Sequence, residues 1–185
     1  MSDAGQSRRG RLLVASPSLV DPNFRRAVVL MLEHSEEGAL GLVLNRPSEL
    51  TTAEALPDGI AELLPPDELV HEGGPVQPEA VIVLADYLDP VEAPTIAFSS
   101  VGIVDPEQVD EARTRIRAAR AFGGYAGWAA GQLEREIDEE AWIDALAIPE
   151  DVFSGDADTL WSRVLERKGG TYRLVARMPE DPSLN

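Results

Sequence analysis

Three short apolar runs near the N-terminus constrain the possible folds of this chain more than any other feature. They cover residues 12–15, 27–32 and 40–44, and Asp-Pro, Glu-Glu-Gly and Asn-Arg-Pro sequences separate or follow them. Short apolar runs bounded by such turn sequences are typical of strands buried on both faces. The Glu-Glu-Gly connection is short, and Gly38 can adopt the positive φ that a tight hairpin requires. The sequence therefore predicts three early strands, of which the second and third form a hairpin.

Strand character returns farther along the chain, at residues 69–71, 80–85 and 95–99. Residues 120–128 are rich in glycine and aromatic side chains. We interpret them as a strand or extended segment that neighbouring backbone approaches closely. Within this segment we expect Trp128 to be buried, because the small residues beside it let an aromatic ring pack against backbone.

Helical patterns are confined to four regions. Residues 50–66 predict short helical pieces that prolines end, and an Asp-Pro-Glu-Gln sequence predicts a helix over residues 105–117. Another helix is expected from residue 129 onward, and the last one has its apolar stripe within residues 160–165 and ends at Gly169. Early strands, late helices and no strict alternation of strand and helix indicate an α+β fold.

Length and composition indicate one globular domain. The chain has 185 residues and a mass of 20.0 kDa, which is enough for one substantial core and short for two. Its 44% hydrophobic and 26% charged residues are ordinary values for a globular protein. Residues 1–10 and 179–185 are polar and lack periodicity, so we expect flexible tails around a single domain at residues 11–178.

The charge of the chain limits its partners. The 33 acidic and 16 basic residues give a formal net charge of -17, which repels polyanions and disfavours direct binding to nucleic acid or to an anionic membrane. The sequence contains no cysteine, which excludes disulfides and thiolate nucleophiles and fits a reducing compartment. Its arginine-containing start lacks the apolar stretch of an export signal, and no aliphatic run approaches the length of a membrane span. We therefore expect a cytoplasmic protein.

Ser16 or Ser18, Asp21 and His34 include the residue types of a nucleophilic triad. Neither serine lies in a Gly-x-Ser-x-Gly sequence, which would place the hydroxyl on a sharp turn between a strand and a helix. Turn formation explains the Ser-Pro and Asp-Pro pairs here better than catalysis does. Because no complete catalytic set is visible, we do not expect an enzyme.

The only two histidines each neighbour a glutamate, in Glu33-His34 and His71-Glu72. Adjacent residues in a strand point to opposite faces, so each pair offers one ligand to a shared metal site. The sequence has no His-x-x-x-His spacing and no cysteine, and we predict neither a metal nor another cofactor. We expect both histidines to cap turns.

Residues 113–120 contain the one basic cluster of the sequence. On a helix Arg113, Arg117 and Arg120 would share one stripe beside acidic neighbours, and we expect a solvated helix face. The alternative is a nucleic-acid contact surface. Phosphate binding would work against the charge of -17, and no aromatic side chains interleave with the arginines to stack on bases.

Glycines and arginines next to predicted strands form the strongest binding constellation. Successive glycine amides can form an anion nest, and a nearby guanidinium adds a bidentate partner for phosphate or carboxylate. This candidate anion pocket comprises Arg25, His34, Asn45, Arg46, Gly73 and Gly74. The alternative, which we favour, is that the glycines permit a tight turn while the arginines neutralise buried acids or bind exposed carbonyl groups.

Four segments resemble the signature sequences of one bacterial family. They are residues 12–47, the His-Glu-Gly-Gly-Pro-Val sequence at 71–76, the glycine-rich and aromatic stretch at 124–142, and the helical pattern at 160–170. In this order they resemble the YqgE/AlgH family. The resemblance covers most of the chain, and four matching segments are far more specific than the Gly-Gly-Pro turn alone.

The resemblance implies a curled, partly barrel-like mixed β-sheet with helices packed outside it. It also implies a regulatory or protein-interaction role without catalysis, and therefore an unidentified protein partner. The family name links it with transcriptional control of alginate synthesis. Two alternatives remain, which are a binding protein or enzyme for a small anionic ligand and a transcriptional regulator that contacts nucleic acid.

Overall fold

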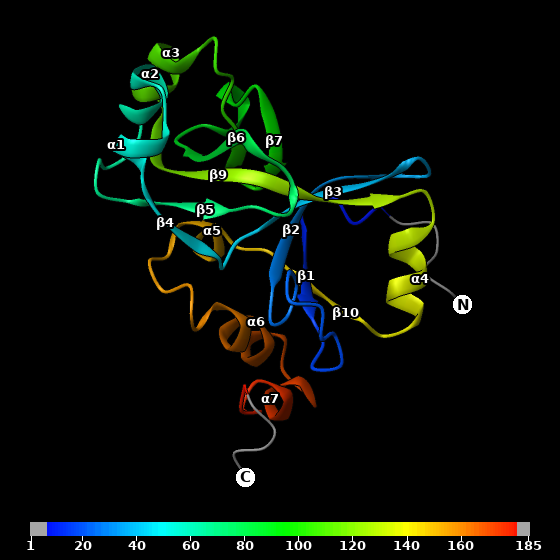
Figure 1. The fold of residues 1–185 in the computed structure, drawn as a ribbon. Coiled ribbons are helices and arrows are strands. Elements are labelled where there is room, and N and C mark those ends of the chain that lie inside the picture. Colours follow the sequence, from blue (N-terminus) through cyan, green and yellow to red (C-terminus); the bar gives the residue numbers. More distant parts are fainter. Residues whose placement is uncertain (1–6, 181–185) are drawn as a thin grey trace.

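The computed structural model describes residues 7–180, and a large open β-sheet forms its centre (Figure 1). Its strands follow the order β10-β1-β2-β3-β9-β6-β8-β7, and β5 pairs with both β4 and β9. Paired strands are antiparallel except β5 and β9, which run parallel. The strands are β1 (Arg11–Ala15), β2 (Val28–Ser35), β3 (Gly38–Val43), β4 (Pro47–Thr51), β5 (Leu69–Glu72), β6 (Val76–Tyr87), β7 (Thr95–Phe98), β8 (Val101–Ile103), β9 (Ile116–Ala129) and β10 (Trp142–Leu146).

The long strand β9 joins the two halves of the sheet. Residues 116–125 pair with β6, and residues 126–129 pair with β3 on the hairpin formed by β2 and β3. Phe122 and Gly123 also pair with β5. In Figure 1 β9 crosses the middle of the molecule, with β6 and β7 on one side of it and β1 and β2 on the other. Segments far apart in sequence therefore meet along this one strand.

Short helices lie at three places around the sheet (Figure 1). Helices α1, α2 and α3 gather at one end, where α1 contacts β4 and β5 and α2 contacts α3. Helix α4 packs against β3, β9 and β10. Helix α6 packs against β1 and β10. None of these helices is long and apolar enough to cross a membrane. The helices are α1 (Thr52–Ala55), α2 (Asp58–Ala61), the 3-10 helix η1 (Pro90–Glu92), α3 (Val109–Arg113), α4 (Gln132–Asp138), α5 (Pro149–Phe153), α6 (Leu160–Lys168) and α7 (Tyr172–Val175).

Strand β2 is buried on both faces, as its uninterrupted apolar sequence predicts. Val28 and Leu30 lie in one hydrophobic cluster with residues of α6, whereas Val29 and Met31 lie in a second cluster with Trp128. A third cluster fills the space between α1, α3, β6 and β9. The sheet thus separates the two main apolar layers, and the turns at its strand ends carry the polar residues that form the candidate site.

The predicted α+β fold with a single domain and flanking helices is confirmed. The three early strands, the hairpin that joins the second to the third, and the helix that ends at Gly169 lie where the sequence places them, but α7 follows that helix and was not expected. Gly169 has a φ of 81° and its amide donates to the Leu165 carbonyl, which ends α6 as expected. The sheet is mostly antiparallel and does not close into a barrel, because β10 and β7 remain at opposite ends of the strand order.

The helix predicted over residues 105–117 is mostly wrong. Only Val109–Arg113 are helical, and the chain re-enters the sheet at Ile116. Both side-chain oxygens of Asp105 accept hydrogen bonds, from the Glu107 amide and the Gln108 side chain, so this sequence forms a turn ahead of the helix. The pairing of β9 with β6 overrides the local helical preference of the following residues.

The expected flexible tails fall partly outside the described residues. Residues 1–6 and 181–185 are not described by the structure. Residues 7–10 contact the domain, because the Arg8 amide donates to the His34 ring and the Gly10 amide to the Met31 carbonyl. At the other end, the carbonyls of Met178 and Glu180 accept hydrogen bonds from two arginines of the candidate site.

Candidate functional site

Asn45 builds the candidate site by holding two turns together. Asn45 is 8% exposed, its Oδ1 accepts the Val28 amide at 2.9 Å, and its Nδ2 donates to the Arg26 carbonyl at 2.9 Å. Arg26 has a φ of 52°, in the left-handed region that a non-glycine residue seldom adopts. Backbone strain of this kind persists only where surrounding structure imposes it, and it is frequent at functional sites. The two hydrogen bonds of Asn45 thus bring Arg25, Arg26 and Arg46 close together.

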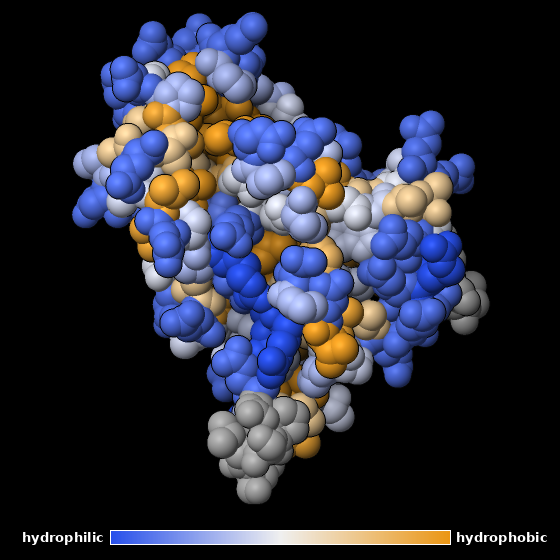
Figure 2. Space-filling view, viewed as in Figure 1, coloured by the Kyte–Doolittle hydropathy of each residue, from blue (hydrophilic) through white to orange (hydrophobic). Residues whose placement is uncertain are grey.

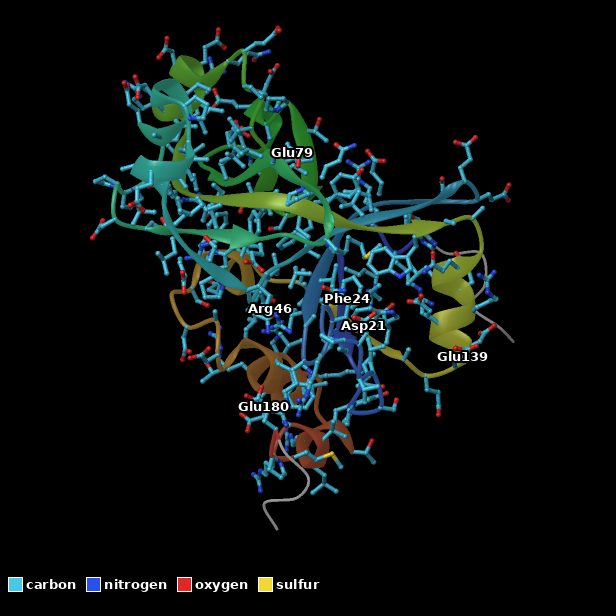
Figure 3. All side chains as sticks on the ribbon, in the orientation of Figure 1. Asp21, Phe24, Arg46, Glu79, Glu139 and Glu180 are labelled. Atoms are coloured by element: carbon cyan, nitrogen blue, oxygen red, sulfur yellow. The ribbon has the colours of Figure 1, made fainter. Side chains whose placement is uncertain are left out.

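These three arginines line a surface depression of about 480 Å³, which we call the arginine depression. The other lining residues are Asn45, Ala157, Asp158, Trp161 and Glu180. Figure 3 shows Arg46 above α6 and Glu180 below it, near α7, on the same side of the molecule. In Figure 2 strongly hydrophilic side chains run down this part of the surface toward the C-terminal residues. Three cations converge here in a chain whose net charge is -17.

Residues 178–180, which we call the C-terminal segment, lie at the arginine depression. The Arg25 guanidinium donates to the Glu180 carbonyl, and the Arg26 guanidinium donates to the Met178 carbonyl. Arg26 also stacks 4.3 Å above the ring centroid of Trp161, whose indole N–H donates to the Ala15 carbonyl at 2.8 Å. Trp161 is buried and therefore forms a fixed platform beneath the guanidinium.

Arg46 occupies the centre of the site. Its guanidinium donates to the carbonyls of Arg25 and Asn45, and the carboxylates of Glu72 and Glu180 lie near enough to favour its charge. Burial lowers the pKa of Arg46, and these two acids act in the opposite direction. Beside it lies a smaller depression of about 140 Å³, which Arg46 shares with Glu72 and Gly74. Arg46 therefore borders both hollows.

The two glycines serve close backbone packing. The Gly73 amide donates to the Gly123 carbonyl at 2.8 Å, so it does not face an anion. A Cβ on Gly73 would lie 2.3 Å from the Gly124 oxygen, and one on Gly74, whose φ is 154°, would lie 2.1 Å from the Tyr125 carbonyl carbon. Such distances are incompatible with a side chain. The anion nest of two successive amides is therefore not formed, and Gly74 contributes only to the smaller depression.

His34 lies away from the arginine depression. It is six residues along β2 from Val28, which places it about 20 Å farther along the strand. Its Nδ1 accepts the Arg8 amide at 3.0 Å, and its Nε2 is 2.6 Å from a carboxylate oxygen of Glu134. Because Nδ1 accepts a hydrogen bond, the proton of the neutral ring is on Nε2, which donates to Glu134. His34 thus anchors residues that precede β1.

His71 is the buried histidine of β5, with a side chain packed 5.8 Å from the ring of Phe122. Burial, together with the charge of Arg120, lowers the pKa of His71 to about 4. Glu68 precedes it by three residues, a spacing that can hold a metal on a helix, but Glu68 pairs with Arg120 instead. Among the described residues, no group of three or more His, Cys, Asp or Glu side chains is placed to bind a metal.

The residues of the triad considered from the sequence are engaged separately. The hydroxyl oxygens of Ser16 and Ser18 are 2.7 Å apart. Asp21 accepts the Asn23 amide at 2.9 Å, which is the turn-forming role expected for an Asp-Pro pair. His34 bonds to Arg8 and Glu134, as described above.

The predicted arginine stripe does not exist. Arg113 ends α3 and pairs with Glu62, whereas Arg117 and Arg120 belong to β9. Residues three apart in a strand point to opposite faces, so Arg117 remains exposed beside Asp86 while Arg120 is buried. The continuous positive surface that a nucleic-acid footprint requires is therefore not formed by these residues.

A carboxylate that sequence reasoning missed joins two tryptophans. One oxygen of Glu136 in α4 accepts both indole N–H groups, from Trp128 at 2.9 Å and from Trp142 at 2.8 Å. The two rings meet edge to face with centroids 5.9 Å apart, and Phe24 packs against both. The expected burial of Trp128 is confirmed. In the sequence Glu136 lies eight residues after Trp128 and six before Trp142. This spacing predicts no contact until the positions of the strands that carry the two tryptophans are known.

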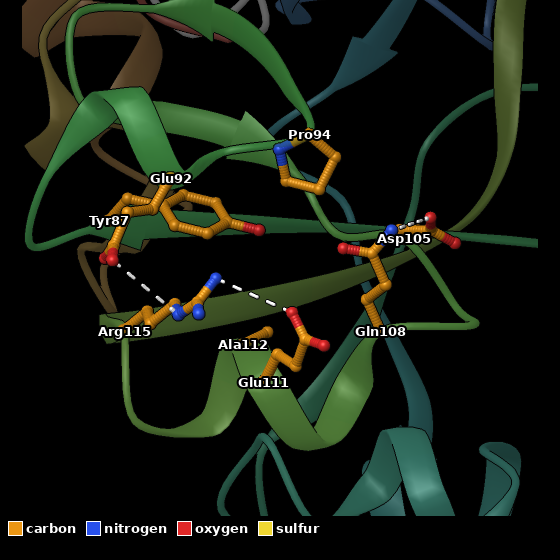
Figure 4. A pocket seen from close by; sticks show the side chains of 8 residues that line it. All are labelled: Tyr87, Glu92, Pro94, Asp105, Gln108, Glu111, Ala112 and Arg115. Atoms are coloured by element: carbon orange, nitrogen blue, oxygen red, sulfur yellow. Dashed lines mark hydrogen bonds and ion pairs between the residues drawn. The ribbon is translucent and has the colours of Figure 1, made fainter.

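Two other hollows suit a ligand less well. Figure 4 shows the first, where the buried Tyr87 ring faces Asp105 and Gln108, and Arg115 reaches between two glutamates. Its volume of about 10 Å³ admits no more than a water molecule, and burial raises the pKa of Tyr87. The second, of about 500 Å³, lies between α2 and α3 and is lined by exposed acids without a converging cation. The arginine depression is therefore the candidate site.

Comparison with known proteins assigns the chain to a family. A family model described as AlgH-like matches residues 12–173. A UPF0301 protein of Streptomyces coelicolor is 44% identical over 97% of this chain and 96% of its own length, and one of Chlorobaculum tepidum is 42% identical over 95% of each.

Two solved structures have the same fold. A crystal structure of a Corynebacterium diphtheriae protein has a TM-score of 0.85 and 26% identity, and covers 96% of this chain and 95% of that one. The solution structure of the Pseudomonas aeruginosa AlgH protein has a TM-score of 0.70 and 29% identity, with 97% and 98% covered. The match to the family model and the full-length relatives show that this chain belongs to the AlgH-like family.

Proposed function

We propose that this protein acts by binding an anionic group at the arginine depression, without catalysis. The observation that carries the proposal is the convergence of Arg25, Arg26 and Arg46 in a strongly acidic chain. Against these three cations the lining contains two acids, Asp158 and Glu180, of which Glu180 belongs to the C-terminal segment. Arginine presents several N–H donors in a fixed plane and suits carboxylate and phosphate groups.

The side chains of the depression favour binding over chemistry. Arginine stays protonated in proteins and offers no general base, and the described residues of the lining include no serine, cysteine, lysine or histidine. The two carboxylates of the lining, Asp158 and Glu180, therefore have no such side chain to pair with in a catalytic set. A protein that binds a group without converting it acts through its complexes. This supports the regulatory or protein-interaction role that the family resemblance implies, and the lack of cysteine supports a cytoplasmic place for it.

Thermal unfolding with phosphate tests the proposal. Binding to the folded state raises its stability by RT ln(1 + [L]/Kd), about 2.7 kcal/mol at a hundredfold excess of ligand over Kd. We expect phosphate to raise the melting temperature, and Arg46→Ala to abolish the rise. Arg135→Ala is the matched control, because Arg135 is an exposed arginine of α4 and lies outside the depression.

Chloride at matched ionic strength is the second control. Salt screens repulsion in an acidic chain and can stabilise the fold without any site. Equal shifts with chloride and phosphate, or a full phosphate response in Arg46→Ala, would contradict the proposal. The arginines would then be structural donors that hold the C-terminal segment in place.

A further inference from the structure

We propose that the anionic group belongs to an extended acidic peptide segment of a partner protein, and that the chain's own residues 178–180 occupy its place. This inference rests on the proposed function, because it concerns the same arginine depression. The observation behind it is the mode of contact. Arg25 and Arg26 hold main-chain carbonyls, those of Glu180 and Met178, rather than side chains.

The contacts of Arg25 and Arg26 are suited to a peptide backbone. The two carbonyls belong to residues two apart, and in extended chain such groups point to the same side. Pro179 lies between them and restricts the preceding Met178 to extended conformations. Two guanidiniums that bind carbonyls two residues apart suit a polypeptide, because alternate residues of an extended chain are about 6.6 Å apart, farther than the oxygens of one phosphate.

Charge adds a preference for acidic residues. Glu180 lies beside Arg46, and its carboxylate raises the pKa of that arginine against the effect of burial. If Glu180 left, Asp158 would be the one acid among the described residues that line the depression, and Glu72 would remain beside Arg46. The incoming segment should therefore carry a carboxylate at the position that Glu180 now holds. The Trp161 ring beneath Arg26 holds that guanidinium in place, both for residues 178–180 and for a partner segment.

The resident segment can be displaced because it lies on the surface. Residues 177–180 are exposed, and Met178 is 47% exposed. A tethered segment competes at an effective concentration in the millimolar range when its linker is short. The observed affinity for a partner segment is the intrinsic affinity multiplied by the fraction of time that the site is free. Residues 178–180 thus lower the observed affinity, and a partner segment must bind tightly enough to displace them.

Fluorescence anisotropy with two labelled peptides tests the inference on the full-length chain. The first has the sequence of residues 178–184, Met-Pro-Glu-Asp-Pro-Ser-Leu, and the second has Gln and Asn in place of its two acids. We expect the acidic peptide to bind, and the neutral peptide to bind about tenfold more weakly, as for the loss of charge-assisted contacts. Arg46→Ala should abolish binding. Arg25→Ala, at an exposed side chain, should weaken it if Arg46→Ala fails to fold.

Glu180→Gln tests the competition by the resident segment. It weakens the contact of that segment with Arg46, so the acidic peptide should bind about threefold more tightly than to the unchanged chain. Glu139→Gln is the matched control, because it makes the same charge change at an exposed acid directly after α4, which Figure 3 shows far from Arg46 and Glu180. It should leave the affinity unchanged.

The outcomes separate this inference from the proposed function. Equal affinities for the acidic and neutral peptides, or no effect of Glu180→Gln beyond that of Glu139→Gln, would overturn it. If phosphate stabilises the fold through Arg46 while neither peptide binds, the site takes a small anion and only the peptide inference fails. If phosphate also has no effect through Arg46, both proposals fail.

Discussion

Gly73 shows how a missing side chain decides the structure at the scale of one residue. We predict that Gly73→Ala lowers the free energy of unfolding by about 2 kcal/mol or more, because its Cβ would overlap the Gly124 carbonyl oxygen, a backbone atom of the central strand β9. Urea denaturation measures the change.

Gly59→Ala is the control for that substitution. A Cβ at Gly59, in α2, would meet no atom within 4 Å. Replacing a helical glycine by alanine stabilises a protein by about 0.5–1 kcal/mol. If Gly73→Ala were as stable as Gly59→Ala, close packing would not explain Gly73.

Trp128 tests the packing of the second hydrophobic cluster. Trp128→Ala should lower the free energy of unfolding by about 3–5 kcal/mol, since it removes a buried aromatic side chain and leaves a cavity beside Phe24 and Trp142. Trp128→Phe keeps a ring in place and should be less damaging. An unchanged denaturation midpoint in Trp128→Ala would show that the ring contributes no packing energy.

Glu136 extends this prediction to a hydrogen bond. Glu136→Leu leaves the indole N–H groups of Trp128 and Trp142 without their acceptor, and each orphaned buried donor costs about 1–3 kcal/mol. Glu136→Gln retains an acceptor oxygen and should be the milder change. If the two variants have the same denaturation midpoint in urea, the shared acceptor does not stabilise the cluster.

At the scale of elements, β9 explains why part of the fold could not be predicted. The early strands were readable because their apolar runs are uninterrupted and Gly38 marks the turn. Residues 113–120 have the composition of a helix, but from Ile116 onward they belong to the sheet, where they pair with β6, which begins 40 residues earlier at Val76. Such long-range pairing has no local sequence signal.

The candidate site was predictable to the same limited degree. Arg25, Asn45 and Arg46 could be named because they sit in turns between predicted strands, and the structure brings them together. His34 failed to join them because it lies at the far end of β2. The C-terminal segment has no periodicity, and its contacts with Arg25 and Arg26 span 155 and 152 residues of sequence. Only the folded chain reveals them.

Arg120 links three elements, and it supplies a prediction at this scale. Its guanidinium pairs with Glu68 ahead of β5 and donates to the carbonyls of Val152 and Ser154 at the end of α5. Arg120→Met should cost about 3–5 kcal/mol in urea denaturation, because it leaves a partly buried carboxylate and two carbonyls without their donor.

Arg117 provides the matched control on the same strand. Its side chain is 51% exposed and pairs with Asp86, so Arg117→Met should cost less than about 1 kcal/mol. Equal losses in the two variants would mean that residues 117 and 120 are not on opposite faces of β9.

At the scale of the whole molecule, stability depends on pH through opposing effects. Lowering the pH reduces the repulsion within a chain of net charge -17, which favours the folded state. His71 acts in the other direction. Its pKa is about 4 in the folded chain against an ordinary value of 6.5, so the unfolded state binds a proton that the folded state rejects. Stability from neutral His71 is therefore complete above pH 6.5 and declines as the pH falls toward 4.

His71→Gln isolates this contribution from the charge of the remaining chain. At about pH 4.5 the free energy of unfolding of the unchanged chain should be about 2–3 kcal/mol lower, because of His71, than at neutral pH. Glutamine does not titrate, so the variant should not show this loss. We therefore expect the change in unfolding free energy between the two pH values to differ by that amount between the variant and the unchanged chain. Urea denaturation at both pH values measures it. Parallel pH profiles for the two chains would show that His71 can take up a proton without leaving its place beside Phe122.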